Sequence, residues 1–508
     1  MRFHRFTALA FGSALAFLLS GAAFVSAAPK DTLVVANMYD AKSLDPHVTP
    51  DLASAHIMVQ IYDTLVKVTD KGEVVPNLAE KFERVDDTTY RFTLRKGVKF
   101  HNGDELRASD VVFTFRRALD VGKTIAYIVG NMDPEGLRVI DDYTVEMKTK
   151  TPDTSFLALL THFGGGCILS EKAVKAAGNE FGSRPVGTGP YEFVSWAKGD
   201  RITLKRNENY WGEKAKIPNV VVRSITEETN RTIELESGGA DIAYAIPPID
   251  IKRVQENEKL VLLRTPDTSV QHMGFNCSKK PFSDVRVRQA ITYAIDLEKL
   301  VKAVFRGIGK PALGPVPPGI RYSNPNLPPV KYDPELSKKL LAEAGYPDGF
   351  KAEIWTNDRK ERIDIATVIQ SMLKKVGIDV KIQVMEWGAY LEKLKEKNHD
   401  MYMMGWGTPV PDPDYAVYGI FHSSQITGMN KAVYSNPEAD RLMDLGRTLK
   451  DGPEREKVYH DLQVLLREQA PWVYVENGEQ VVGIRRNVKG FVPNPAGYHR
   501  LSTVFFEE

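Results

Sequence analysis

Cysteine is almost absent from this 508-residue sequence, and neither sign of charge is in excess. The two cysteines, Cys167 and Cys277, cannot form a disulfide framework, although one bond between them is left open. Neither CxxC nor the Cys/His spacing of a metal site occurs. Lys and Arg number 67 and Asp and Glu 66, so the formal charge of +1 gives no electrostatic basis for binding nucleic acid or an anionic membrane. We therefore expect no metal, no cofactor and no nucleic-acid partner.

Long hydrophobic runs are also missing, with one exception at the N-terminus. Arg2 and Arg5 precede an apolar run over residues 6–25, which ends in the small residues Ser26-Ala27-Ala28. This order is typical of a cleavable secretory signal peptide, with cleavage near Ala27 or Ala28. The alternative, an uncleaved membrane anchor, would call for a basic flank that does not follow. We expect residues 1–28 to be removed and the mature protein to lie in the periplasm.

The local signatures of several enzyme classes do not occur either. GxSxG, HExxH and GxxxxGK[ST] are absent, which removes the usual α/β-hydrolase, zincin and P-loop motifs. Ser371-Met372-Leu373-Lys374 matches the S-x-x-K of penicillin-binding enzymes, but no K-T-G follows and Ser371 falls inside an expected helix. His422 is interpreted as structural. We expect no enzyme activity, and a secreted S-x-x-K hydrolase is the alternative from another class.

What is present is a long folded chain of ordinary composition. With 43% hydrophobic and 26% charged residues over this length, the sequence predicts about two to four domains. Residues 74–184 show a mixed α+β pattern. Strand and helix signals alternate over residues 190–246 and again, more clearly, over residues 352–406, which predicts an α/β fold. The proline-rich stretch 311–329 is interpreted as an ordered loop of the same lobe, with an interdomain linker as the alternative.

The second alternating region has the order β-α-β-α-β. Its expected elements are a strand over residues 352–356, a helix over 363–376, a strand over 379–385, a helix over 390–397 and a strand over 400–406. Right-handed crossovers would make the three strands parallel, with a ligand crevice at their carboxyl ends. Met385-Glu386-Trp387 and Gly405-Trp406-Gly407 would then lie beside that crevice.

An aromatic and acidic cluster follows at residues 406–415. Prolines stiffen this segment, and two carboxylates, Asp412 and Asp414, are held on it. Acids on a stiff loop lose little entropy when they meet a cation, so a binding role is one interpretation of these residues. The alternative is an Asp-Pro turn with solvated acids.

Short motifs along the mature chain occur in an order that resembles one known family. They are Ser43-Leu44-Asp45-Pro46, Pro76-Asn77-Leu78-Ala79, Phe92-Thr93-Leu94-Arg95-Lys96-Gly97-Val98-Lys99-Phe100-His101-Asn102-Gly103, Gly187-Thr188-Gly189-Pro190-Tyr191, Asn209-Tyr210-Trp211-Gly212, Phe282-Ser283-Asp284-Val285-Arg286-Val287-Arg288-Gln289-Ala290, and Gly405-Trp406 followed by Asp412-Pro413-Asp414. The ordered set resembles the periplasmic dipeptide- and oligopeptide-binding proteins of ABC transporters, solute-binding protein family 5.

The resemblance implies a two-lobed periplasmic binding protein clamp of the class II, cluster C type, with an additional α+β domain on the first lobe. Lobe I would comprise residues 29–67, 185–274 and 480–508, the additional domain 68–184, and lobe II 275–479. It also implies a monomer that closes around a small solute, a di- or oligopeptide, and delivers it to ABC permease subunits in the inner membrane. The alternatives are a non-peptide ligand, namely glutathione, an opine, an oligosaccharide or a nickel chelate, and a chaperone or signalling receptor that uses the same clamp.

The resemblance further implies which residues meet the solute. In peptide-binding members an aspartate shortly after the Gly-Trp pair binds the peptide amine, but here Pro409 occupies that position. Asp412 or Asp414 would replace it, or the solute would carry no amine there. The complete set of expected ligand-binding residues is Asp40, Trp387, Trp406, Thr408, Asp412, Asp414, Tyr415 and Tyr474, with no catalytic residue.

Overall fold

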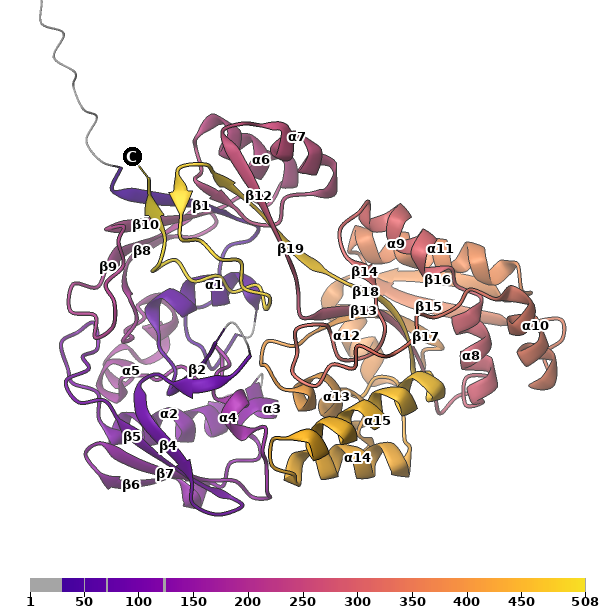
Figure 1. Cartoon of the computed structure of the whole chain (residues 1–508), viewed down its shortest axis with the longest axis horizontal. Coiled ribbons are helices and arrows are strands. Elements are labelled where there is room, and N and C mark those ends of the chain that lie inside the picture. Colours follow the sequence, from indigo (N-terminus) through magenta and orange to yellow (C-terminus); the bar gives the residue numbers. More distant parts are fainter. Residues whose placement is uncertain (1–29, 50, 70–71, 122–124, 508) are drawn as a thin grey trace, which may run out of the picture.

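The computed structural model describes residues 30–49, 51–69, 72–121 and 125–507, and the expected signal peptide lies outside them. Three main sheets organise this part of the chain (Figure 1). Two belong to the two lobes, and the third belongs to the additional domain below the first lobe in the view shown. Within the described residues, no helix has the length and apolar character needed to cross a membrane. The expected α/β class with a two-lobed clamp and an additional α+β domain is confirmed.

The first lobe is built on a seven-stranded sheet. Its strands, in spatial order, are β12 (Leu260–Pro266), β19 (Glu479–Arg485), β11 (Ile242–Ala243), β1 (Thr32–Asn37), β10 (Asn219–Ser224), β9 (Arg201–Arg206) and β8 (Tyr191–Ala197). Its helices are α1 (Leu52–Ile61), α6 (Glu228–Ser237) and α7 (Ile251–Glu256), and β20 (Val488–Lys489) pairs with β21 (Phe505–Phe506) near the C-terminus. Leu33, Ile57 and Val220 are among the buried residues that join the sheet to α1.

The additional domain contains a four-stranded antiparallel sheet. The strands, in spatial order, are β4 (Ala79–Arg84), β5 (Thr89–Leu94), β7 (Thr144–Lys148) and β6 (Arg138–Asp141). The helices are α2 (Ala108–Val121), α3 (Ala126–Val129), α4 (Phe156–Leu159) and α5 (Glu171–Ala177), and the hairpin β2 (Val66–Val68) with β3 (Val74–Pro76) links this domain to the first lobe. Alternating burial along β5 places Tyr90, Phe92 and Leu94 in its core, as a strand covered on one face requires.

The second lobe is built on a six-stranded sheet. In spatial order the strands are β14 (Lys310–Pro311), β18 (Trp472–Asn477), β13 (Ser269–Phe275), β17 (Met401–Gly407), β15 (Lys351–Asn357) and β16 (Asp379–Met385). One face packs on α8 (Val285–Tyr293), α9 (Leu297–Phe305), α10 (Pro334–Glu343) and α11 (Lys360–Lys374), and the other on α12 (Trp387–Lys395), α13 (Pro413–Phe421), α14 (Pro437–Thr448) and α15 (Pro453–Gln469). Four 3₁₀ turns are also present in the described chain, at Pro134–Gly136, Gly178–Ser183, Pro248–Asp250 and Ser423–Gln425.

The predicted β-α-β-α-β unit is confirmed in the second lobe. Strand β15 pairs parallel with β16, opposing Lys351 to Asp379, and parallel with β17, opposing Ile354 to Met401. Gly377 lies just after α11 and has φ +88°, a backbone conformation that favours glycine. This glycine ends the helix where the sequence predicts. The carboxyl ends of β15, β16 and β17 therefore share one edge of the sheet.

The chain crosses between the lobes at two adjacent places. Strand β12 leads to β13 through Asp267 and Thr268, and β18 leads to β19 through Gly478. The two crossings are bonded to each other, since the amide of Asp267 donates to the carbonyl of Gly478 at 2.9 Å. The exact residue limits of the lobes stay a prediction.

Two smaller expectations concern the proline-rich loop and the cysteines. Gln463 on α15 donates to the carbonyl of Tyr322 at 2.8 Å, and Arg467 donates to the carbonyls of Leu313 and Pro328, so the loop packs on the second lobe. Cys167 and Cys277 are both free, and the possible disulfide between them is not formed.

Candidate ligand-binding cleft

Residues 408–411 of the second lobe lie between the lobes. The amide of Thr408 donates to the carbonyl of Thr268 at the crossing, at 2.8 Å. Across the cleft, the hydroxyl of Tyr498 in the first lobe donates to the carbonyl of Pro409 at 2.6 Å. Val410 is buried in the core of the additional domain. This segment therefore touches all three bodies.

Two adjoining cavities open around the same segment. The smaller has a volume of about 130 Å³ and is bounded by residues 68–69, Gly72, Thr268, residues 319–320, residues 408–411, residues 494–496 and Tyr498. The larger has about 710 Å³ and lies between residues 72–75, Phe82 and residues 154, 157 and 158 of the additional domain and residues 319–321, 411, 412 and 451 of the second lobe. Because both are lined by Gly72, Gly319, Ile320 and Pro411, they form one interdomain cleft.

The cleft carries charges of both signs and one unsatisfied hydroxyl. Glu73, Arg321 and Asp451 line the larger cavity, and Arg321 and Asp451 form an ion pair at 2.9 Å that leaves both side chains partly exposed. Thr408, an expected site residue, is buried against the smaller cavity, and its Oγ1 has no hydrogen-bond partner in the described part of the chain. A buried hydroxyl without a partner is costly, which favours Thr408 as a group that a solute or water satisfies.

The structure brings Trp406 and Tyr415 together beside this segment. Their rings stack with centroids 5.5 Å apart, and the indole N–H of Trp406 donates to the carbonyl of Tyr415 at 3.2 Å. The Tyr415 ring also lies 6.2 Å from the ring of His162 in the additional domain. Burial raises the pKa of the Tyr415 hydroxyl above its usual range, so this phenol stays neutral.

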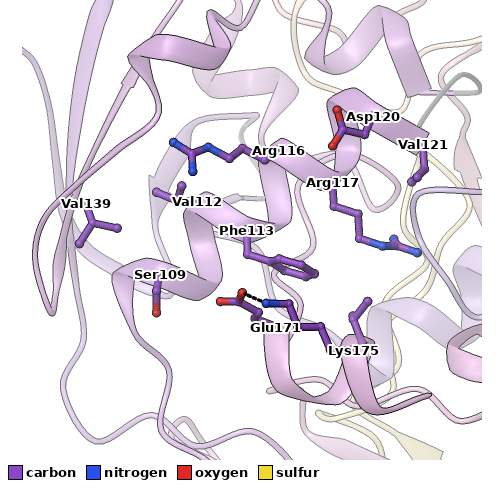
Figure 2. A pocket seen from close by; sticks show the side chains of 11 residues that line it. Ser109, Val112, Phe113, Arg116, Arg117, Asp120, Val121, Val139, Glu171 and Lys175 are labelled. Atoms are coloured by element: carbon purple, nitrogen blue, oxygen red, sulfur yellow. Dashed lines mark hydrogen bonds and ion pairs between the residues drawn. The ribbon is translucent and has the colours of Figure 1, made fainter. Parts of the chain in front are cut away.

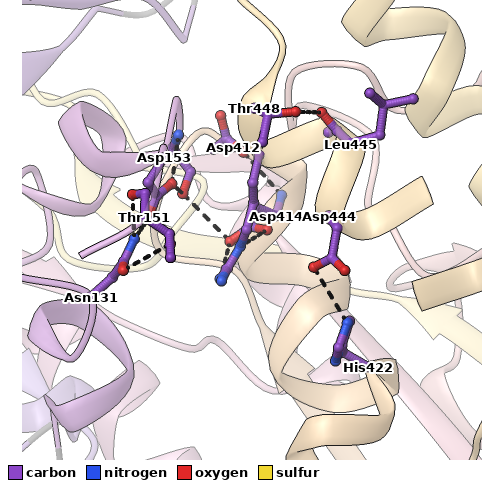
Figure 3. A network of polar contacts seen from close by, with 12 residues as sticks. Asn131, Thr151, Asp153, Asp412, Asp414, His422, Asp444, Leu445 and Thr448 are labelled. Carbon is purple, nitrogen blue, oxygen red and sulfur yellow. Dashed lines mark hydrogen bonds and ion pairs between the residues drawn. The ribbon is translucent and has the colours of Figure 1, made fainter. Parts of the chain in front are cut away.

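The two acids of the cluster have arginine partners instead of free carboxylates. Asp412 receives both Nη atoms of Arg455 at 2.8 and 2.9 Å, and Asp414 receives Nε and Nη2 of Arg447 at 2.8 and 2.9 Å. Ser155 of the additional domain adds a hydrogen bond to Asp414 at 3.4 Å, beside Asp153 (Figure 3). The expectation that Asp412 or Asp414 waits for a cation therefore needs correction: these side chains stabilise the second lobe and its contact with the additional domain.

Asp40 and Tyr474 are placed away from the cavity lining. The carboxylate of Asp40 accepts hydrogen bonds from the indole of Trp196 at 3.0 Å and from the amide of Gly199 at 2.7 Å, which ties two loops of the first lobe together. Tyr474 is buried among the side chains that join the second sheet to α13–α15. Both placements favour a structural interpretation over a ligand contact.

Trp387 lies at the shared carboxyl edge of the parallel strands, as predicted. It is the first residue of α12, which Glu386 caps by accepting from the amide of Ala389 at 3.1 Å. The indole is 41% exposed, and the guanidinium of Arg362 lies 5.6 Å from its ring centroid. An exposed tryptophan held by a cation–π contact is a ready stacking surface for a solute.

Sequence reasoning missed three polar residues at this edge. Arg362 donates to the side chain of Asn357 at 3.0 Å, and its Nε has no partner among the described residues. Glu476 and Gln271 lie opposite each other on β18 and β13 and are both buried. Glu476 had a visible signal, because it is the one charged residue in the strand WVYVEN.

A separate pocket lies in the additional domain, where α2 and α5 meet Val139 of β6. It has a volume of about 520 Å³ and is lined by residues of α2 and α5, including Arg116, Glu171 and Lys175 (Figure 2). Lys175 and Glu171 pair with each other at 2.5 Å, and Arg117 is committed to Asp45 at 2.6 Å. This pocket shares no lining residue with the interdomain cleft.

Comparison with known proteins gives the family. Residues 73–428 match the model of bacterial extracellular solute-binding proteins, family 5. The chain is 34% identical over 470 residues to heme-binding protein A of Haemophilus influenzae, covering 86% of this chain and 85% of that protein, and 33% identical over 481 residues to the dipeptide-binding protein of Escherichia coli, covering 88% and 89%. The periplasmic binding protein DppA of Helicobacter pylori, solved in complex with the peptide STSA, superposes with a TM-score of 0.82 at 31% identity over 94% of this chain and 98% of that one. The chain therefore belongs to family 5 of the bacterial extracellular solute-binding proteins.

Proposed function

We propose that the protein is the periplasmic solute-binding component of an ABC importer and that it captures a short peptide in the interdomain cleft. The observation that carries this proposal is the cleft itself, in which residues 408–411 meet both the first lobe and the additional domain around adjoining cavities of about 710 and 130 Å³. Volumes of this order suit small solutes. Residues 1–28 would direct export and then be removed.

The topology supplies a mechanism for release and capture. Two adjacent crossings, at residues 267–268 and at Gly478, join otherwise separate sheets, so the lobes can rotate about them while each keeps its own core. Contacts such as that between Tyr498 and Pro409 form only when the lobes approach. A solute that bridges the lobes then favours the closed form, which permease subunits can distinguish from the open form.

The lining favours a peptide over a large apolar ligand. Glu73, Arg321 and Asp451 provide both signs of charge, as a zwitterion with hydrogen-bonding groups along its length requires. The relatives named for heme and for dipeptides are about equally similar to this chain, so similarity alone does not select the solute. Glutathione, which is itself a peptide-like zwitterion, is the second candidate on the same observation.

Calorimetric titration tests the solute, and uptake tests the transport role. We expect heat with at least one member of a series from dipeptides to pentapeptides, accompanied by a decrease in the radius of gyration as the lobes close. Heat with glutathione, an opine, an oligosaccharide or a nickel chelate but with no peptide of the series would remove the peptide assignment and leave transport standing. Unchanged uptake of the bound solute in a deletion strain would contradict transport and favour a receptor or chaperone role.

A further inference from the structure

Glu476 is a buried acid at the base of the second lobe, two residues before the crossing at Gly478. Glu476 is 2% exposed, and the other residues of β18 are also buried. Gln271 of β13 pairs with Glu476 of β18. On its other neighbouring strand, β17, Gln271 pairs with Gly405. The register of the ladder shifts between Gln271 and His272, and the pairing places Glu476 and Gln271 next to each other at this irregularity.

Glycines make room for these two polar side chains. A Cβ at Gly309 would lie 1.9 Å from Oε1 of Glu476, and a Cβ at Gly405 would lie 2.8 Å from Nε2 of Gln271. Gly405 directly precedes Trp406, so the polar pair lies next to the carboxyl edge that carries the candidate cleft. Any larger residue at either glycine would displace the pair.

Neither acceptor is satisfied within the described chain. No hydrogen bond or ion pair there reaches the carboxyl of Glu476, and Oε1 of Gln271 is buried without a partner. The charged groups that face Glu476 are Asp267 at the crossing, Glu361 and Arg359 at the start of α11, and Glu479 on β19. Arg359 is already paired with Glu361 at 2.6 Å, and Glu479 with Arg264 at 2.6 Å.

Burial and this acidic surrounding decide the protonation of Glu476. Burial is the largest cause and Asp267 the next, and together with Glu361 they raise the pKa of the carboxyl to about 9. In the free protein the group is therefore a neutral acid at pH 7. A cation within hydrogen-bond distance would reverse this balance, because the carboxylate form is then compensated.

We propose that Glu476, assisted by Gln271, binds a protonated amine of the solute, so that the protein selects solutes with an organic cation. This inference rests on the proposed function. The two acids after Trp406, Asp412 and Asp414, cannot bind the solute amine, because each is already paired with an arginine. A metal ion does not fit, since the described residues contain no group of three or more His, Cys, Asp or Glu side chains placed to hold one.

Binding has a proton balance that can be measured. The O–H bond of the Glu476 carboxylic acid breaks, its proton passes to the buffer, and the carboxylate oxygen then accepts an N–H of the ammonium group. One proton is released for each amine bound at a pH between the bound and free pKa values. Affinity for an ammonium solute therefore rises as the pH increases toward about 9, until the solute amine itself deprotonates.

The test uses the mature protein with the tetrapeptide Ser-Thr-Ser-Ala and its N-acetylated form as probes. Titration at pH 7 in phosphate and in Tris, whose ionisation enthalpies differ, reports the protons released. We expect the free-amine peptide to bind about tenfold or more tightly than the acetylated peptide, with release of close to one proton. The variant Glu476→Gln should lose both effects, and the control Glu479→Gln, whose carboxylate already pairs with Arg264, should keep them.

Other outcomes would contradict the assignment of Glu476, the peptide-binding function, or both. Equal binding of the two peptides, or tight binding without proton release by the wild-type protein, overturns the assignment of Glu476 and leaves the peptide-binding function standing. No heat with these two peptides or with any other member of the series from dipeptides to pentapeptides overturns both. The proton count is measured on the wild-type protein, so the test holds even if Glu476→Gln does not fold.

Discussion

Asp412 gives the sharpest test of the corrected site, because the sequence predicts a ligand contact and the structure places it in an ion pair. Arg455 is fully buried and receives support from two aspartates: Asp412, which is almost fully buried, and Asp451, whose side chain is 43% exposed. The Nε of Arg455 donates to the carbonyl of Gly446 at 2.7 Å. Burial is the largest single cause and lowers the pKa of the Arg455 guanidinium, but the charge and hydrogen bonds of Asp412, together with Tyr459 and Asp451, outweigh burial and raise this pKa above its usual value.

The perturbation is Asp412→Asn, with Asp451→Asn as the matched control. Asparagine keeps the shape of Asp412 and, through its one oxygen, the capping bond to the amide of Asp414 at 3.0 Å, but it removes the negative charge and the second oxygen that accepts from Arg455. A buried arginine then loses its bidentate partner, which costs about 3–5 kcal/mol of unfolding free energy. The exposed partner Asp451 contributes only about 0–1 kcal/mol, so its variant should be close to wild type.

Urea unfolding followed by tryptophan fluorescence measures this difference, since Trp406 and Trp472 report the second lobe. At a temperature where both variants are folded, solute affinity should match wild type for Asp412→Asn. If Asp412→Asn were as stable as Asp451→Asn and yet lost solute affinity, the carboxylate would be free for a ligand and the ion-pair argument would be wrong.

Three further predictions follow from single side chains. Trp387→Ala should weaken solute binding by about 2 kcal/mol with little change in stability, because it removes an exposed aromatic surface that Arg362 holds in place; wild-type affinity in titration would place the solute elsewhere. Glu476→Gln should stabilise the protein increasingly from pH 5 to 8. The folded pKa of about 9 lies above the ordinary value of 4.5, so the wild type loses stability as the pH rises between these values, by about 3 kcal/mol at pH 7, and a pH-independent difference in urea midpoint would contradict this. Tyr498→Phe should weaken binding by about 1 kcal/mol through the lost bond to Pro409, without a matching loss of stability in urea; equal affinity would show that this bond is absent from the bound form.

The parts of the fold that depend on local pattern were predictable. In the β-α-β-α-β unit over residues 351–407, apolar residues recur with clear helix and strand periodicity, a glycine follows α11, and the connections are short. Its strands pair in the expected parallel order. The pairing of β13 with β18 joins segments about two hundred residues apart, and no local signal specifies it. This pairing sets where the lobes cross, and that is why the limits of the lobes could not be derived from the sequence alone.

The aromatic residues of the site were easier to predict than the acids. Trp387 comes shortly after one predicted strand and Trp406 is the last residue of another, so the strand positions locate both residues at the carboxyl edge. The role of an acid depends on its partner, and Arg447 and Arg455 lie on helices more than thirty positions after the acids they bind. A signal was present in α15, where Arg455 shares the buried stripe of Val458, Tyr459 and Leu462, a position that an unpaired arginine would not occupy.

The same criterion separates structural acids from acids available to a solute. An acid whose charge is matched by a buried arginine contributes to folding and has little to gain from a ligand, as with Asp412 and Asp414. Glu476 is buried to a similar degree, but burial and the charge of Asp267 raise the pKa of its carboxyl, and Glu476 has no ion pair in the described chain. A ligand cation would therefore add an interaction that the folded protein does not make by itself. Proximity to the Gly-Trp pair in the sequence therefore identifies the correct loop, whereas the balance of buried charge identifies Glu476 as the acid on which a solute can act.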